Sequence, residues 1–371
     1  MPVALKQFIE VMERIAPLRY AEDWDNVGLL IGDREDSVNR AMLTIDFTEE
    51  ILAEAIEKKA DLVITYHPVM FRPVQRITAD NVAGRLLLHT MSHGIQLYSP
   101  HTALDATPGG VTDWLTDAIG TGYRRPLTPY QNLPENRQVK IVTFVPTNAA
   151  DRLRDALASA GAGRIGDYEQ CSFNVTGKGT FRGSQDTNPT VGRPGQLEVA
   201  DEVRIEMVCA VKGLSILIST LKQFHPYEEP AFDLYPLHPI PSHKSGAGRR
   251  VVLDQPATVA DVAVRLKDHL NIASAKITSP AREVKVIGIV PGSGSSVLDT
   301  AIEQGCDLFI TGEMSHHRAL EAEGLGCSII LTGHTNSERG YLPILADRLS
   351  ADLPDLNTFV SETDRSRFTF V

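Results

Sequence analysis

The chain carries one eleven-residue stretch twice, as Ala55-Ile-Glu-Lys-Lys-Ala-Asp-Leu-Val-Ile-Thr65 and again as Ala301-Ile-Glu-Gln-Gly-Cys-Asp-Leu-Phe-Ile-Thr311. The two copies are identical at seven positions, and each has the pattern of a helix end that runs into a buried strand. A strand-like run precedes each helix, at 41–46 and at 285–290. This strand–helix–strand order favours parallel strands with helices on the faces of the sheet. The sequence therefore predicts an α/β fold whose main domain contains a duplicated βαβ-type unit.

A second repeated pattern, His-Thr-x-x-carboxylate, follows a short apolar run near each end of the chain. It extends from His101 to Asp105 and again from His334 to Glu338, and His67 also follows a predicted strand. Functional side chains of open α/β sheets gather beyond the carboxyl ends of the strands, so we expect the three histidines at one edge. Imidazole and carboxylate are ligands of the divalent metals used in hydrolysis. The two half-sites therefore indicate a dinuclear metal site.

Each copy of this pattern has a structural alternative. The threonine would cap a helix start, and the acid would offset the helix dipole. Two copies together with His67 favour the metal interpretation. Asp105 and Glu338 lie four residues after their histidines, a spacing that puts both side chains of a pair on one helix face. Since a carboxylate is able to bridge two ions, we expect these two acids to be shared ligands.

Composition restricts the class of protein. At 371 residues the chain is expected to form two or three domains. The net charge of −11 opposes nonspecific nucleic-acid binding. Four scattered cysteines without a Cys-x-x-Cys pair exclude a thiolate zinc cluster and fit a reducing cytosol. The N-terminus has the pattern of an amphipathic helix, and no apolar run reaches membrane-spanning length. We therefore expect a cytoplasmic protein with no membrane partner.

The segment between the two repeats has a different character. Its predicted elements, in chain order, are a strand at 140–145, a helix at 151–160, a hairpin-like pair at 172–177 and 179–182, a strand at 202–210 and a helix at 214–224. This order indicates a ferredoxin-like α+β module inserted into the main domain. The predicted domains are 1–127, the first half of the metal-binding main domain, 128–241, the insert, and 242–371, the second half.

Short motifs extend over nearly the whole chain. They are Trp24-Asp-Asn-Val-Gly-Leu29, Thr65-Tyr-His-Pro68, Ser99-Pro-His-Thr-Ala-Leu-Asp-Ala106, Gly312-Glu-Met-Ser-His-His317 and Gly333-His-Thr-Asn-Ser-Glu-Arg339. They resemble the signatures of the Nif-three-like family, many of whose members are catalogued as GTP cyclohydrolase I type 2 homologues. The resemblance implies a dinuclear metal centre in a ring-shaped homohexamer. The insert resembles the PII/CutA-like module of longer bacterial members.

The resemblance also implies a ligand set and cofactors. The implied ligands are His67, His101, Asp105, His334 and Glu338. Two divalent ions per chain would be bound, and this donor set suits zinc, iron, manganese or cobalt alike. Many members have two adjacent histidines where this chain has Tyr66 before His67. Tyr66 is therefore a further but weaker candidate ligand, because its phenol must first lose a proton.

Other residues are candidates for supporting roles. Glu313 is a candidate general base, or else an acid that offsets a helix dipole. The glycine-rich turn 291–296 is a candidate anion site, although it is not a Walker motif. Asp46 is a candidate for contacting substrate or for capping a helix. Asp25 is a weaker candidate near the site.

Two function hypotheses of different classes remain at this point, and whether the chain is an enzyme stays open. The first is a metal-dependent hydrolase of a small, nucleotide-like and phosphate-bearing substrate, with GTP cyclohydrolase activity implied by the resemblance alone. The alternative is a non-catalytic, metal-stabilised ring that senses a ligand or binds a partner through its insert. Passage of single-stranded nucleic acid is a third and weaker hypothesis, which the net charge opposes.

Overall fold

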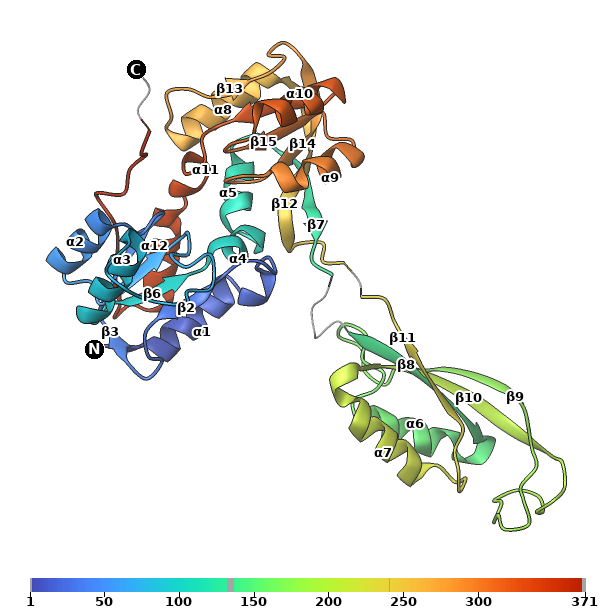
Figure 1. The fold of residues 1–371 in the computed structure, drawn as a ribbon. Coiled ribbons are helices and arrows are strands. Elements are labelled where there is room, and N and C mark those ends of the chain that lie inside the picture. Colours follow the sequence, from blue (N-terminus) through green and yellow to red (C-terminus); the bar gives the residue numbers. More distant parts are fainter. Residues whose placement is uncertain (1, 132–136, 240, 369–371) are drawn as a thin grey trace. The chain divides into compact units, whose positions relative to one another are not determined.

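The computed structural model describes residues 2–131, 137–239 and 241–368. The chain has a mixed α/β fold and forms two units (Figure 1). Unit 1 consists of Met1–Tyr130 and Ser242–Val371, and unit 2 consists of Gln131–Pro241. Within the described residues, no helix has both the length and the apolar character needed to span a bilayer.

The first sheet of unit 1 is built around the first copy of the repeated stretch. Its strands lie in the order β17 (Asn357–Val360), β4 (Arg40–Thr44), β5 (Leu62–Thr65), β6 (Gln96–Ser99) and β2 (Gly28–Ile31). All neighbours are parallel except β2, which pairs antiparallel with β6. Helix α2 (Glu49–Glu57) leads into β5, so the first copy of the stretch forms the helix end and strand that its pattern predicts.

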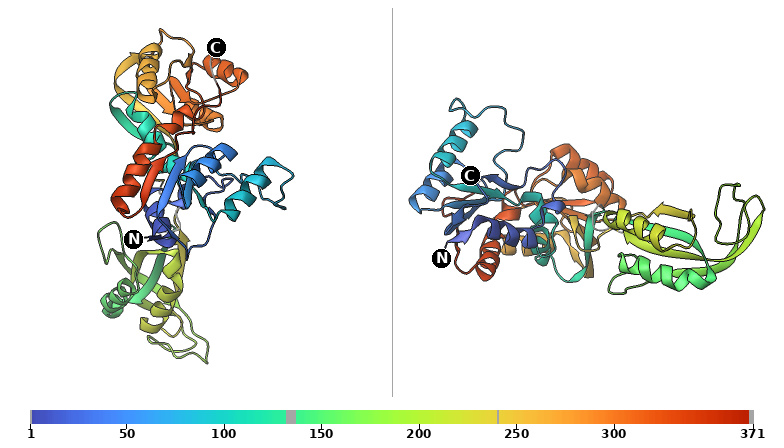
Figure 2. Two further views of the ribbon diagram at one scale, coloured as in Figure 1. Left: turned by 90° about the vertical axis from the view of Figure 1, so that its left-hand side faces the viewer. Right: turned by 90° about the horizontal axis from the view of Figure 1, so that it is seen from below.

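Helices cover both faces of this sheet (Figures 1 and 2). On one face, α1 (Leu5–Ile15) and α12 (Leu342–Asp352) form a core with alternate strand residues such as Leu43. On the other face, α2 and α3 (Val82–Ser92) pack against the intervening residues such as Met42. Because both faces are covered, the central strands β4 and β5 are buried almost throughout instead of alternating between buried and exposed residues.

The second sheet of unit 1 is built around the second copy. Its strands lie in the order β13 (Lys276–Ile277), β16 (Ser328–Leu331), β15 (Leu308–Thr311), β14 (Glu283–Ile289), β12 (Gly246–Thr258) and β7 (Gly122–Pro129). Strands β14, β15 and β16 are parallel. Helices α9 (Leu298–Glu303) and α10 (His316–Gly324) pack on one face, and α5 (Val111–Asp117) and α8 (Val259–Leu270) pack on the other. The second copy of the stretch thus forms α9 and β15, as the first forms α2 and β5.

Unit 2 is a four-stranded antiparallel sheet with two helices. Its elements follow the chain order β8 (Gln138–Pro146), α6 (Ala150–Ser159), β9 (Phe173–Phe181), β10 (Glu198–Ala210), α7 (Leu214–Phe224) and β11 (Phe232–Pro236). The strands lie in the order β11, β8, β10 and β9. Leu153 of α6 and Leu217 of α7 are fully buried in a core with the apolar residues of the sheet.

One prediction for unit 2 is wrong. The residues predicted as a hairpin-like pair form the single strand β9, which pairs along its whole length with β10. The prediction places a turn between Gly177 and Gly179, but the backbone is extended through both glycines within the strand. A Cβ at Gly179 would lie 2.1 Å from the Glu202 side chain of the neighbouring strand. The glycine therefore leaves room for the Glu202 side chain instead of making a turn.

Candidate metal centre

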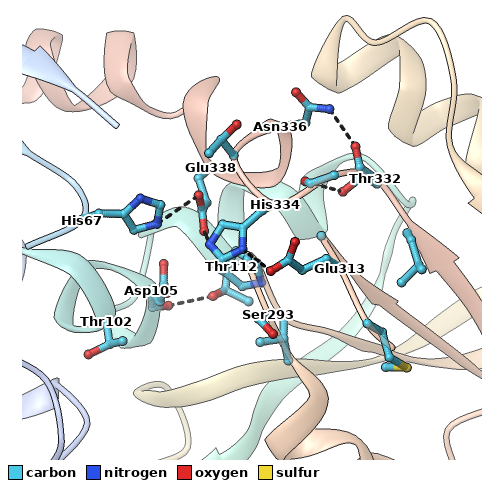
Figure 3. Close-up of a pocket in the computed structure, with 18 of the residues that line it drawn as sticks. His67, Thr102, Asp105, Thr112, Ser293, Glu313, Thr332, His334, Asn336 and Glu338 are labelled. Atoms are coloured by element: carbon cyan, nitrogen blue, oxygen red, sulfur yellow. Dashed lines mark hydrogen bonds and ion pairs between the residues drawn. The ribbon is translucent and has the colours of Figure 1, made fainter. Parts of the chain in front are cut away.

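Side chains that follow strands of both sheets in unit 1 come together at one point. They are His67, His334 and Glu338, and their ligand atoms all lie within 4.8 Å of one another (Figure 3). His67 Nε2 is 3.5 Å from Glu338 Oε2, and His334 Nε2 is 3.6 Å from Glu338 Oε1. His67 follows β5, whereas His334 and Glu338 follow β16. The group therefore joins the two repeated halves of the chain.

Two atoms of this group lack the partners that buried polar atoms normally have. Among the described residues, His67 Nε2 and Glu338 Oε2 are buried without a hydrogen bond. A buried polar atom without a partner costs roughly 1–3 kcal/mol. Both atoms are acceptors once the imidazole is neutral, and a divalent cation satisfies such acceptors. The donor set therefore fits a metal ion.

Gly292 keeps space open beside the group. It lies in the turn after β14 with a φ of +60°, and a Cβ there would be 2.5 Å from Glu338 Oε1 and 3.2 Å from His334 Nε2. Only glycine fits this backbone and this space without displacing the ligand-type atoms. Its N–H donates to Ser337 Oγ at 2.8 Å, and the Gly294 N–H donates to Thr311 Oγ1 at 2.9 Å. Two amides of the predicted anion site are therefore bonded within the protein.

Each candidate histidine contacts a carboxylate through Nδ1. The pairs are His67 with Asp46 at 2.8 Å, His334 with Glu313 at 2.9 Å and His101 with Asp25 at 2.8 Å. A carboxylate at Nδ1 fixes the tautomer and the ring orientation, and it makes Nε2 a better ligand. This arrangement is typical of metal-binding histidines.

His101 and Asp105 lie beside the three-residue group but are not part of it. Both line the same cavity, and the His101 ring centroid is 5.3 Å from that of His67. His101 begins α4 (His101–Ala106) with a φ of +28°, a strained conformation for a residue that is not glycine. The Tyr66 hydroxyl donates a short hydrogen bond to Asp105 Oδ1.

The charges of the site favour a cation. Burial alone would lower the pKa of His67, but the hydrogen bond with Asp46 and the negative charges of Asp46 and Glu338 outweigh it and raise that pKa to about 10. Burial, together with the charge of Glu338, raises the pKa of Asp105 well above its usual range. Burial and the charges of Asp105 and Glu338 also raise the pKa of Tyr66. Negative potential at this point therefore stabilises positive charge.

A cavity of about 1330 Å³ surrounds the group. Its wall includes the acids Asp46 and Glu313, the bases Lys276 and Arg365, and the exposed aromatic ring of Trp24. The volume is more than enough for a small organic ligand. Such a ligand would lie within reach of both the histidine group and basic side chains.

The sequence only partly indicated the residues that support the site. The Asp25 side chain is fully buried and also accepts from the Thr102 N–H at 3.2 Å. The motif around Trp24 was the only sequence signal for this contact. Asp46 contacts a histidine instead of capping a helix. The C-terminal residues that line the cavity, Arg365 to Phe368, follow no motif and were missed.

The C-terminal segment is fixed by buried hydrogen bonds. Burial alone would raise the pKa of Glu54, but bonds from Ser361, Thr363 and the Glu362 N–H outweigh it and lower that pKa to about 2. Asp364 accepts from the Ile45 N–H at 2.9 Å. These bonds hold the segment at the edge of the cavity.

Comparison with known proteins gives full-length matches. The model of the family described as Duf34/NIF3 (NGG1p interacting factor 3) matches residues 3–367. A Bacillus subtilis protein named GTP cyclohydrolase 1 type 2 homolog is 34% identical over 370 residues, which are 99% of this chain and 98% of that protein.

Solved structures are similar over the same length. A Bacillus cereus protein related to NIF3 has a TM-score of 0.68 at 31% identity and covers 98% of both chains. A Staphylococcus aureus protein has a TM-score of 0.78 at 29% identity, covering 100% of this chain and 99% of that one. The similarity to this family, in sequence and in fold, therefore extends over nearly the whole chain.

Proposed function

The chain belongs to the Duf34/NIF3 family, and from that membership we propose that it binds two divalent metal ions and hydrolyses a small nucleotide-like substrate. The match confirms the resemblance inferred from the five sequence motifs. The observation that carries the proposal is the convergence of His67, His334 and Glu338, with two buried ligand-type atoms that make no hydrogen bond among the described residues.

The proposed ligands divide into two half-sites. His67, His334 and Glu338 would hold one ion, and His101 and Asp105 would contribute ligands to the other. When bound, the ions supply Lewis acidity and a water that is activated near neutral pH. The donor atoms suit zinc, iron, manganese or cobalt. Tyr66 acts in this proposal as a hydrogen-bond donor to Asp105, a role supported by their contact.

Residues around the proposed ligands orient the histidines and attract the substrate. Asp25, Asp46 and Glu313 hold the three histidines through Nδ1. Glu313 is 60% exposed and lines the cavity, so its carboxylate is also our candidate general base, able to accept a proton from a bound water. Arg365 and Lys276 attract a phosphate group to the same cavity.

The proposed organisation follows the resemblance. Residues 1–127 and 242–371 form the metal-binding domain, and 128–241 form a ferredoxin-like, PII/CutA-like insert. The strand order of unit 2 and its two helices support that description of the insert. We further propose a homohexamer in the cytoplasm.

A second candidate function is ligand sensing without catalysis. It is supported by a cavity of about 520 Å³ within unit 2, whose wall includes Phe144, Arg204 and Tyr227. In this alternative the metal ions stabilise the main domain, and a small molecule binds to the insert. A metabolite that raises the melting temperature without being turned over would favour it.

Metal content per chain, measured by mass spectrometry, tests the proposal. Wild type should contain close to two equivalents, and His334→Ala should lose most of them. The matched control is His317→Ala, since His317 is exposed and lies outside the cavity. With metal restored, wild type should hydrolyse a member of a nucleotide panel and His334→Ala should not. Metal-free wild type with an intact fold would overturn the metal site, and equal turnover in His334→Ala would overturn the hydrolase.

A further inference from the structure

Two large aromatic side chains are exposed in the cavity beside the candidate metal centre. Trp24 is 62% exposed and Phe71 is 49% exposed, and both line the cavity. Both rings contact the His101 ring edge-to-face, with centroid distances of 6.0 Å for Trp24 and 5.6 Å for Phe71. Aromatic side chains carry large apolar surfaces that are usually covered. Two such surfaces at one wall of a cavity form a candidate binding surface.

Hydrogen bonds hold the segments that carry these rings. The side chain of Asp25, next to Trp24, is fully buried and hydrogen-bonded to His101 Nδ1 and to the Thr102 hydroxyl. The Asn26 side-chain amide donates to the Met70 carbonyl at 2.7 Å, directly before Phe71. The two aromatic segments are therefore tied to each other and to a candidate metal ligand. A surface fixed before binding loses little conformational entropy when a ligand arrives.

The rest of the wall determines which ring fits. It carries the hydroxyl of Ser293 and the positive charge of Arg365. A hydrocarbon ring would leave these polar groups without partners, whereas ring nitrogens and exocyclic polar groups would bond to them. Aromatic faces in turn favour a flat π-system over a saturated ring.

We propose that Trp24 and Phe71 form a stacking surface for a planar nitrogen heteroaromatic ring of the substrate, held beside the metal ligands. This inference rests on the proposed function, because it assigns a ligand class to the same cavity. It makes Trp24 and Phe71 specificity-determining residues. Stacking of a base on an aromatic side chain changes affinity by about 5- to 150-fold.

Tryptophan fluorescence provides a direct test. The chain contains two tryptophans, and Trp114 lies outside the cavity, with its ring 4.6 Å from that of His269. In metal-loaded Trp114→Phe protein, Trp24 is therefore the sole tryptophan reporter. At least one of guanosine, adenosine, cytidine and nicotinamide should quench its emission with saturation. Ribose and the saturated ring of piperidine-3-carboxamide should not. Quenching by none of the aromatic probes, or equally by the saturated ones, would overturn the proposal.

Affinity measurements on variants complete the test. For the probe that binds best, Trp24→Leu and Phe71→Leu should each weaken binding about 5- to 150-fold by calorimetry, and Trp24→Tyr should restore most of it. Tyr123→Leu is the matched control, since Tyr123 is 63% exposed but lies outside the cavity. Unchanged affinity in both leucine variants would overturn the stacking surface.

Two further readouts separate this proposal from its alternatives. Metal content and molecular mass by light scattering should be equal in all variants. Loss of metal in Trp24→Leu would instead make Trp24 a positioning residue for His101, and a changed mass would make it a subunit contact; either result overturns stacking. Saturable binding without turnover would refute the hydrolase and leave the stacking surface intact. Turnover unaffected by both leucine substitutions would refute the stacking surface and leave the hydrolase intact.

Discussion

Neutralising the carboxylates that contact the histidines should weaken metal binding in a definite order. The distances from the carboxylate oxygen to the histidine Nδ1 are nearly the same, at 2.8 Å for Asp25, 2.8 Å for Asp46 and 2.9 Å for Glu313. The side chains differ instead in exposure, at 0%, 39% and 60% respectively. Because distance is nearly constant, solvent screening should decide how much each charge contributes.

The expected magnitudes follow from that exposure. Removing a carboxylate behind a metal-binding histidine typically weakens metal affinity about 10- to 100-fold. Asp25→Asn should approach the upper end, because the charge is fully buried. Asp46→Asn should be near tenfold. Glu313→Gln should be about fivefold or less, since exposed charge pairs contribute roughly 0–1 kcal/mol.

Competition between each variant and a chromophoric chelator for Co²⁺ measures these affinities. Asp299→Asn is the control, because Asp299 pairs with Arg318 away from the cavity. If Glu313→Gln lost the most metal affinity, or if all three variants lost the same affinity, solvent screening would not decide the contribution of each carboxylate. A Glu313→Gln variant that keeps its metal but loses turnover would support the role of Glu313 as general base.

Three other predictions concern the centre and the segment beside it. Chelation should lower the melting temperature of wild type by several degrees and leave His334→Ala unaffected, as differential scanning fluorimetry with and without EDTA would check. Gly292→Ala should lose metal, whereas Gly305→Ala, at a φ of +74° with open space around it, should keep metal at a similar backbone cost. The pKa of Glu54 is lowered from 4.5 to about 2 on folding, so this residue should contribute about 3 kcal/mol above pH 4.5, lost as the pH falls toward 2. Urea unfolding of Glu54→Gln should therefore show lower stability at pH 6 and a shallower decline between pH 5 and 3.

Local patterns predicted the elements of the main domain, because the repeated stretch fixes both the helix ends and the strands. Patterns of this kind also put His67 and His334 after strands of two sheets. The pairing of His101 with Asp25 could not be predicted, since 76 residues separate them and no periodicity links a loop acid to a helix start. The error at β9 has a similar cause, because the partner that explains Gly179 lies on another strand.

The division of the candidate ligands between distant parts of the chain has a consequence for biosynthesis. His67 leaves the ribosome long before His334 and Glu338, by roughly 10 to 50 seconds at typical translation rates. All of unit 2, Gln131–Pro241, is synthesised in that interval. A nascent or prematurely terminated chain therefore exposes His67 without its distant partners, so the proposed site would be completed and loaded with metal only after translation. Retained metal would then mark a polypeptide that had been synthesised past Glu338.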